Sequence, residues 1–142
     1  MTFLPDSLHL TDEQIKRQIE DYKHLHAHPE LSHQEKETAK FIENFFNKLE
    51  LASGTERKIF RIGETGVVLA LTRGEGPVVG FRADTDGLPM AEETGLDYAS
   101  KAKATIDGKE VDVMHGCGHD AHIVGALYAA DAAIALALAV VL

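Results

Sequence analysis

The hydrophobic pattern of the first 28 residues is typical of an amphipathic helix. Thr11 and Gln14 have the spacing of a capping box, in which each side chain satisfies a free backbone N–H group of the first turn. Pro29 cannot continue helical hydrogen bonding, so the helix is expected to end just before it. Its expected apolar stripe consists of Ile15, Ile19, Tyr22 and either Leu25 or His26.

A second helix is expected after Pro29, with Ser32 and Glu35 at its start and Gly54 beyond its end. Apolar residues recur there at steps of three and four, which predicts one buried face. That face would contain Thr38, Phe41, Ile42, Phe45, Phe46 and Leu49.

From Lys58 the pattern changes to short β-rich runs separated by glycine-containing turns. Runs at 58–62, 66–72 and 78–83 are expected to form neighbouring strands, and 104–113 a hairpin in which Asp107-Gly108 provides a type I′ turn. Helices, then strands, then a further helix predict a layered α/β domain.

The segment 123–142 is almost entirely apolar, with Asp131 as its one charged residue. Its length would allow a bilayer crossing. It lacks flanking aromatic or basic anchors, however, which favours a buried helix followed by a buried strand.

Composition narrows the possible partners and surroundings. At 142 residues and 44% hydrophobic content, the chain is expected to form one globular domain. A net charge of -9 argues against nucleic acid and anionic membranes as partners, because repulsion would oppose both. A single cysteine excludes an internal disulfide, and the first residues lack a signal-peptide pattern, so a cytoplasmic location is expected.

Candidate chemistry is concentrated at 114–122, which reads Met-His-Gly-Cys-Gly-His-Asp-Ala-His. Thiolate, imidazole and carboxylate are the donors that divalent metals bind. If a helix begins near His119, then His119 and His122 share one face, with Cys117 in the turn before it. Taken singly, each residue is more often an ordinary buried or solvated side chain. The rival interpretation, a Cys-His nucleophile pair, also needs an oxyanion hole, for which the sequence gives no sign.

Asp84 and Asp86 follow the apolar run 78–81 and would emerge together at the carboxyl end of a strand, where α/β sheets place ligand crevices. Turn capping is the commoner explanation for such a pair, and Arg82 could neutralise one carboxylate.

The remaining histidines and glutamates have weaker signals. Residues two apart on a helix point in different directions, so His24, His26 and His28 are interpreted as mostly structural, with His26 or His28 at a pocket margin. His9 and His33 are expected to be solvated surface residues. Glu30 and Glu35 are expected to be helix-capping or surface groups.

Three motifs resemble those of the metal-dependent amidohydrolase and metallopeptidase family that contains hippurate hydrolases, N-acyl-amino-acid amidohydrolases (aminoacylases) and auxin-conjugate hydrolases. They are Leu-His-Ala-His-Pro-Glu-Leu-Ser at 25–32, Phe-Arg-Ala-Asp-Thr-Asp-Gly-Leu-Pro at 81–89, and the cluster at 114–122. They occur in the family's order, and the similarity extends from about Ile15 to about Asp131.

The resemblance implies hydrolysis of the amide bond of N-acyl amino acids or related conjugates by two divalent metal ions, either Zn, Mn, Co or Ni. It implies that Cys117 and His119 are metal ligands and that Asp86 supports a ligand imidazole. Asp84, Asp120 and His122 are weaker candidates for the site. The implied fold is an incomplete portion of a layered α/β/α zinc-peptidase-like catalytic domain.

In this family the general-base glutamate, the remaining ligands and a smaller dimerisation and lid domain follow the matched region. Residues 1–142 are therefore expected to be the amino-terminal portion of a longer, homodimeric enzyme and to be inactive alone. The alternative is a noncatalytic fragment that binds metal weakly or serves as an interaction module through its sheet edge and apolar tail.

Overall fold

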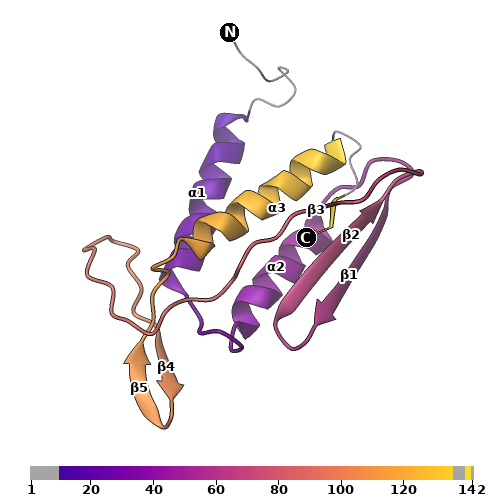
Figure 1. Cartoon of the computed structure of the whole chain (residues 1–142). Helices are drawn as coiled ribbons and strands as arrows, with labels where there is room; N and C mark the ends of the chain where they lie inside the picture. The colour runs from indigo at the N-terminus through magenta and orange to yellow at the C-terminus, as the bar shows by residue number, and fades with distance from the viewer. Residues whose placement is uncertain (1–9, 136–139, 142) are drawn as a thin grey trace.

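The computed structural model describes residues 10–135 and 140–141 of the chain. These residues form an α/β structure, as expected (Figure 1). In chain order the elements are α1 (Asp12–Ala27), α2 (Lys36–Lys48), β1 (Glu56–Ile62), β2 (Gly66–Thr72), β3 (Val79–Gly80), β4 (Lys103–Ile106), β5 (Lys109–Asp112), α3 (His119–Ala135) and β6 (Val140–Val141).

Helix α1 begins with the expected capping box. The Thr11 hydroxyl oxygen accepts the backbone N–H of Gln14 at 3.2 Å, and Gln14 Oε1 accepts the backbone N–H of Thr11 at 2.8 Å. The helix ends at Ala27, before Pro29. Both limits of the first helix are therefore confirmed.

The buried face of α1 is shorter than its apolar stripe. Leu25 and His26 are buried, whereas Ile15 is 42% and Ile19 49% exposed. Helices α1 and α3 come together near the last turns of α1 and diverge toward its first turn, so α3 covers only the end of the stripe (Figure 1). The expected apolar stripe is therefore buried only at its carboxyl-terminal end, and Ile15 and Ile19 remain exposed.

Helix α2 starts at Lys36, later than Ser32, with Glu35 as its N-cap residue. His33 has a φ of 64°, a left-handed conformation that interrupts any helix begun at Ser32. The expected buried face is confirmed: Thr38, Ile42, Phe45, Phe46 and Leu49 are buried, and Phe41 packs partly buried against them.

The main sheet has the strand order β1-β2-β6-β3. Strands β1 and β2 form an antiparallel hairpin in which Glu56 lies opposite Thr72. Strand β6 is antiparallel to β2 and parallel to β3. The expected β3 run shortens to Val79–Gly80, and it does not adjoin the hairpin, because the crossover through α3 returns β6 between them.

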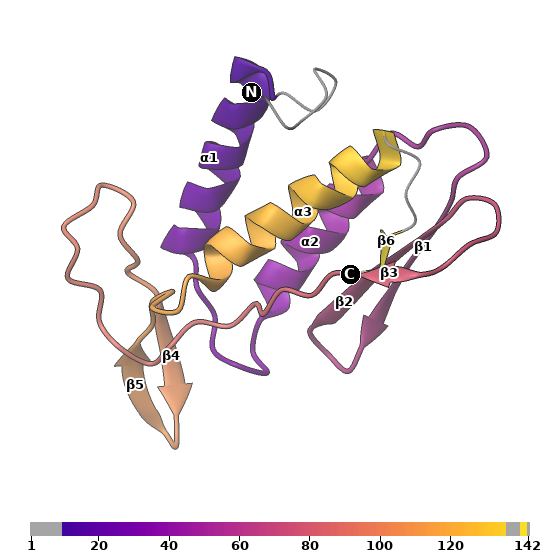
Figure 2. The same ribbon diagram turned by 45° about the horizontal axis from the view of Figure 1, so that its top comes forward.

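The helices lie on one side of this sheet: α2 packs against β2, and α1 packs against α3, farther from the strands (Figures 1 and 2). Leu69 and Leu71 of β2 are buried on that face, and Arg57 of β1 donates to the carbonyls of α2 and its C-cap at 2.8 and 3.0 Å. On the opposite face, Phe60 is 47% and Ile62 64% exposed. The described residues therefore contain the sheet and one of the two helical layers that an α/β/α domain has.

Strands β4 and β5 form a separate hairpin in the expected place. Asp107 and Gly108 connect them with φ angles of 50° and 75°. Positive φ at both central residues is the requirement of a type I′ turn, which confirms the turn prediction.

Helix α3 and strand β6 account for the described part of the apolar tail. Ile123, Leu127 and Ala130 of α3 are buried in the core, and the backbone of β6 pairs with β2 and β3. Within residues 10–135 and 140–141, no helix is both long and apolar enough to cross a membrane. The prediction of a helix followed by a strand is confirmed, although 136–139 and 142 lie outside the described residues.

Replacing Leu127 by Ala tests the core. The side chain is 1% exposed, so the change should lower the free energy of unfolding by about 2–5 kcal/mol through lost burial and a residual cavity. Ile19→Ala, at a half-exposed position, should cost less than about 0.5 kcal/mol. Denaturant unfolding followed by circular dichroism measures both; equal losses would contradict the packing described here.

Candidate metal centre

A glycine bend places Cys117 and His119 at the start of α3. Gly118 separates them with a φ of 75°, a conformation that favours glycine, and the N–H of His122 donates to the Gly118 carbonyl at 3.1 Å. Cys117 is exposed and lies just before the positive end of the helix. The chain therefore brings a thiol and an imidazole together at one helix terminus, as the sequence predicts.

Asp86 fixes the orientation of the His119 ring. The ring Nδ1 lies 2.9 Å from the backbone carbonyl oxygen of Asp86 and 3.0 Å from its carboxylate Oδ1. Because both neighbours are acceptors, Nδ1 donates its hydrogen to them, and Nε2 keeps its lone pair. Histidines that bind metals commonly have this arrangement, and its hydrogen-bonding partner raises the basicity of the ring.

Asp84 lies in a different environment from Asp86. Its Oδ1 accepts from Arg82 at 2.6 Å, and its side chain is 49% exposed. Asp84, Asp86 and His119 all line the same cavity, but only Asp86 contacts the imidazole. Arg82 therefore neutralises Asp84, which was one of the alternatives that the sequence left open.

The other two predicted residues divide between the surface and the interior. His122 is exposed, with its ring centroid 6.1 Å from that of His119, so the two rings share one face of α3. Asp120 is only 2% exposed; its Oδ1 accepts the N–H of Ala121 at 2.8 Å, and its Oδ2 lies 2.7 Å from His26.

Cys117 and His119 suit a divalent metal as donor types, and Asp86 prepares His119 for that role. A catalytic ion needs about three protein donors, however. Within the described ranges, no three His, Cys, Asp or Glu side chains lie close enough to hold a metal ion. The described residues therefore supply two donors that suit a metal ion, fewer than a complete catalytic site needs.

A cavity of about 980 Å³ adjoins this region, between α2, α3 and the segment that follows β3. Apolar side chains form much of its wall, among them Ile42, Phe46 and Leu127. His119 and Asp86 line it as well, so the oriented imidazole borders a space large enough for a small molecule.

Glu30 and Glu35 differ in their surroundings. The Glu30 carboxylate caps α2 by accepting the N–H groups of Glu37 and Thr38 at 3.1 and 2.7 Å, as expected for a capping group. Glu35 is only 6% exposed and lines the cavity, and its Oε2 has no hydrogen-bond partner among the described residues. Glu35 thus occupies the N-cap position of α2, as expected for a capping group, but its side chain makes no capping hydrogen bond and does not lie at the surface.

The histidines also differ in burial. His33 is exposed, as expected, and His9 lies outside the described residues. His115 is 5% exposed, with neither ring nitrogen hydrogen-bonded in the described part of the chain, and burial lowers its pKa. His26 is buried in an ion cluster, so it does not lie at a pocket margin. His28 is exposed and borders a smaller cavity between α1 and α2, not the cavity beside His119.

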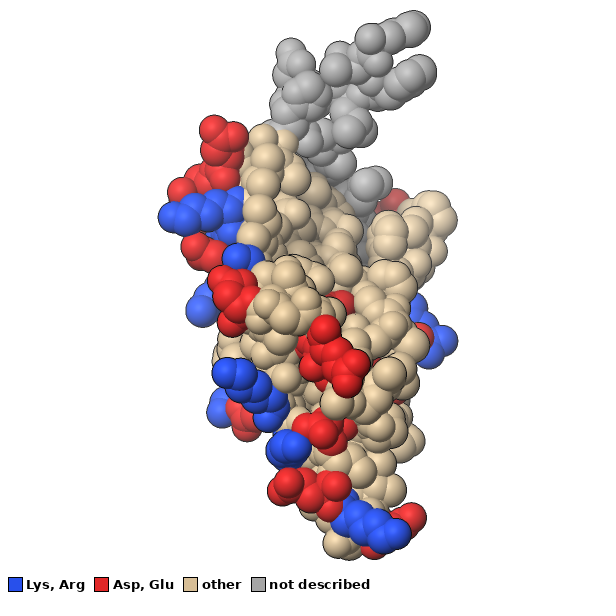
Figure 3. Space-filling view, turned by 90° about the vertical axis from the view of Figure 1, so that its left-hand side faces the viewer, with Lys and Arg blue, Asp and Glu red and all other residues tan. Residues whose placement is uncertain are grey.

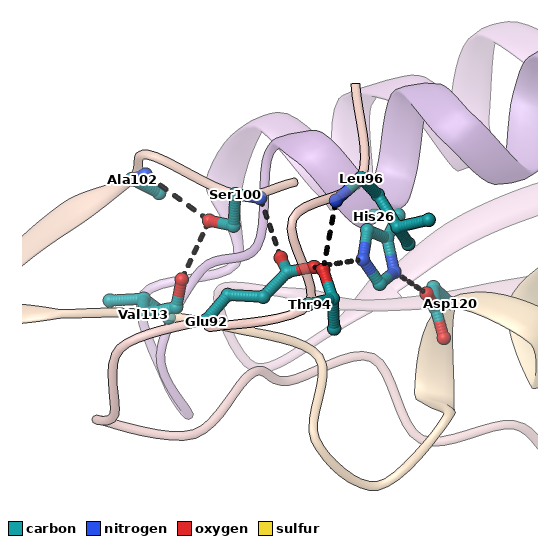
Figure 4. Close-up of polar contacts among 8 residues, drawn as sticks. All are labelled: His26, Glu92, Thr94, Leu96, Ser100, Ala102, Val113 and Asp120. Carbon is teal, nitrogen blue, oxygen red and sulfur yellow. Dashed lines mark hydrogen bonds and ion pairs between the residues drawn. The ribbon is translucent and has the colours of Figure 1, made fainter. Parts of the chain in front are cut away.

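Figure 4 shows the ring of His26 between two carboxylates. Its Nδ1 lies 2.7 Å from Asp120 Oδ2, and its Nε2 lies 3.0 Å from Glu92 Oε1. Burial alone would lower the pKa of His26, but the two hydrogen bonds outweigh it and raise that pKa above its ordinary value. The protonated ring can donate to both carboxylates at once.

Glu92 is the residue that sequence reasoning missed. Its side chain is inaccessible to solvent. Burial would raise its pKa, but hydrogen bonds from the Thr94 hydroxyl, the His26 ring and the Ser100 N–H hold the pKa at about 2. Glu92 lies in a loop without a regular hydrophobic pattern. Its role depends on a buried contact with His26, 66 residues earlier in the sequence, which no local motif indicates.

The described surface has charges of both signs. On the face shown in Figure 3, Lys and Arg side chains are interspersed with Asp and Glu rather than gathered in one area. This face therefore carries no patch of a single charge sign (Figure 3).

Comparisons with known proteins agree with the motifs. The sequence profile described as Peptidase family M20/M25/M40 matches residues 80–140. The chain is 38% identical over 124 residues to an N-acyl-L-amino acid amidohydrolase of Geobacillus stearothermophilus, an alignment that covers 80% of this chain and 30% of the relative. It is 41% identical over 109 residues to an N-acetylcysteine deacetylase of Bacillus subtilis, covering 75% and 25%.

The fold has a solved counterpart as well. A crystal structure of a dinuclear metal binding peptidase of the M20 family from Bacillus subtilis aligns with a TM-score of 0.73 and 33% identity. The alignment covers 89% of this chain and 33% of that protein. The chain thus spans about a third or less of the length of these relatives.

The Glu92 cluster predicts a defined acid sensitivity. Ionised Glu92 stabilises the fold fully above the ordinary glutamate pKa of 4.5, and this contribution is lost as the pH falls through 4.5 toward 2. Glu92→Gln should be less stable than the unaltered chain at pH 6 and lose less stability over that interval. Urea unfolding at each pH measures this, with exposed Glu93→Gln as the control; identical pH profiles for Glu92→Gln and the unaltered chain would refute the assignment.

Proposed function

The chain belongs to peptidase family M20/M25/M40, and on that premise we propose that the protein containing it hydrolyses the amide bond of N-acyl amino acids using two divalent metal ions. The observation that carries this proposal is the contact of His119 Nδ1 with both oxygen acceptors of Asp86, beside Cys117. Relatives named as an amidohydrolase and a deacetylase support the same reaction class.

In this proposal each residue has a distinct role. Cys117 and His119 hold metal, and Asp86 orients the His119 ring. Bound metal would polarise the scissile carbonyl and lower the pKa of a water molecule. Asp120 supports the start of α3 from the interior, while His122 and Asp84 border the site.

The rest of the machinery is proposed to lie outside the described residues. Two donors do not complete a catalytic site, which uses about three plus water, and the general-base glutamate is expected elsewhere in the protein. The proposal therefore treats this chain as inactive alone and the whole protein as a cytoplasmic homodimer. The ions would be zinc, manganese, cobalt or nickel, since thiolate favours zinc and the other donors admit all four.

One observation favours a second candidate, a noncatalytic interaction module. Phe60, Ile62 and Val79 are apolar strand residues that are 47%, 64% and 49% exposed. Such an exposed sheet face marks a surface that another polypeptide covers. In the enzyme proposal, the remainder of the same protein would cover it.

The intact mass of the protein isolated from its native cells distinguishes these candidates. A mass well above 15.5 kDa, with hydrolysis of N-acetyl amino acids in added manganese or zinc, is the expected result. A mass of 15.5 kDa without hydrolysis would favour the module.

Substitutions in that active protein test the assigned roles. Cys117→Ser and His119→Gln should abolish hydrolysis by removing metal donors. Asp86→Asn should lower metal affinity or activity by about 10–100-fold, because it weakens support of the ligand ring. His28→Gln changes an exposed histidine of the same chain and should have no effect. If elemental analysis finds full metal content in Cys117→Ser, Cys117 is not a metal ligand.

A further inference from the structure

The cluster of His26, Asp120 and Glu92 joins three parts of the chain far apart in sequence (Figure 4). His26 belongs to the last turn of α1, Asp120 to the first turn of α3, and Glu92 to the loop before β4. The side chains of His26, Glu92 and Asp120 are 8%, 0% and 3% exposed. Ions are buried this deeply only when paired, so removing one leaves an uncompensated charge.

One arm of the cluster reaches the metal centre through Asp120. Asp120 directly follows His119, and its second carboxylate oxygen accepts the N–H of Ala121 at 2.8 Å. Its contact with His26 therefore fixes the first turn of α3 from the interior side. Asp86 fixes the same turn from the cavity side through the His119 ring.

The other arm reaches the segment before Cys117. Glu92 accepts the N–H of Ser100 at 2.6 Å, and the Ser100 hydroxyl donates to the carbonyl of Val113 at 2.6 Å. Met114 follows and pairs with Leu88 through two backbone hydrogen bonds of 2.7 and 3.0 Å. Hydrogen bonds thus connect His26 to the chain on both sides of the Cys117 bend.

We propose that His26 is a positioning residue for the metal centre, which sets the relative placement of Cys117 and His119 by bridging Asp120 and Glu92. This inference rests on the proposed function for the role of those two donors. It assigns His26 no contact with metal or substrate. Its effect passes through Asp120 to the helix start and through Glu92 and Ser100 to the strand end before the bend.

The test uses the 142-residue chain and Co²⁺ as the probe. Cys117 is the chain's one cysteine, so an absorption band from thiolate bound to cobalt reports on that residue alone. His26→Gln, which cannot bridge two carboxylates as a cation, should weaken Co²⁺ binding by about tenfold or more, as loss of a supporting contact does. His28→Gln, an exposed histidine in the same turn region, should stay within about twofold of the unaltered chain.

A double substitution tests the route. If His26 acts through Asp120, then His26→Gln added to Asp120→Asn should weaken Co²⁺ binding by less than it does alone. If circular dichroism shows that His26→Gln does not fold, Asp120→Asn tests the positioning role instead. That variant keeps His26 and Glu92 but breaks the link from His26 to the start of α3, so the same tenfold loss of Co²⁺ affinity is expected. A folded variant that binds within twofold of the unaltered chain would overturn the proposal.

Amide hydrogen exchange separates this inference from the proposed function. If the cobalt spectrum of the unaltered chain equals that of Cys117→Ser, the two donors of this chain do not hold cobalt without the rest of the protein, and the metal content of Cys117→Ser in the whole protein decides the ligand role. The positioning role is then decided without metal: exchange at Ala121 and His122 should quicken about tenfold in His26→Gln and stay unchanged in His28→Gln. Unchanged exchange in a folded His26→Gln would reject the positioning role itself.

Discussion

The hydrogen bonds between Asp86 and His119 are the constraint on which the candidate centre depends. They join the segment after β3 to the first residue of α3 across 33 positions of sequence. Two acceptors at Nδ1 leave Nε2 as the nitrogen that can bind a cation. Without them the imidazole could rotate, and the cysteine two residues earlier would have no fixed partner.

The scaffold holds this contact from two directions. Leu127 and Ile123 anchor α3 in the core, which fixes the height and direction of the helix. Buried ions then fix its first turn, through Asp120 and His26. Apolar packing is tolerant of small shifts, whereas a bridged ion cluster requires defined distances. The combination places a rigid, partial donor set beside a cavity.

The local features of the fold could be predicted from sequence because each depends on a few adjacent residues. The Thr11 capping box, the Asp107-Gly108 turn and the helix start near His119 are of this kind. The similarity to the amidohydrolases was also readable, since the motifs are contiguous. Long-range pairing was not: Glu92 bears no local mark of its partner His26, and a pattern of apolar residues cannot show that α3 stops short of Ile15 or that β6 lies beside β3.

The tautomer of His119 is the most direct measure of whether this geometry exists. Two-bond ¹⁵N–¹H correlation spectra of the metal-free chain distinguish a ring with hydrogen on Nδ1 from one with hydrogen on Nε2. The structure predicts the Nδ1–H form for His119, with Nε2 carrying the lone pair, and a shift toward the Nε2–H form in Asp86→Ala. An Nε2–H ring in the unaltered chain would contradict the account at its foundation.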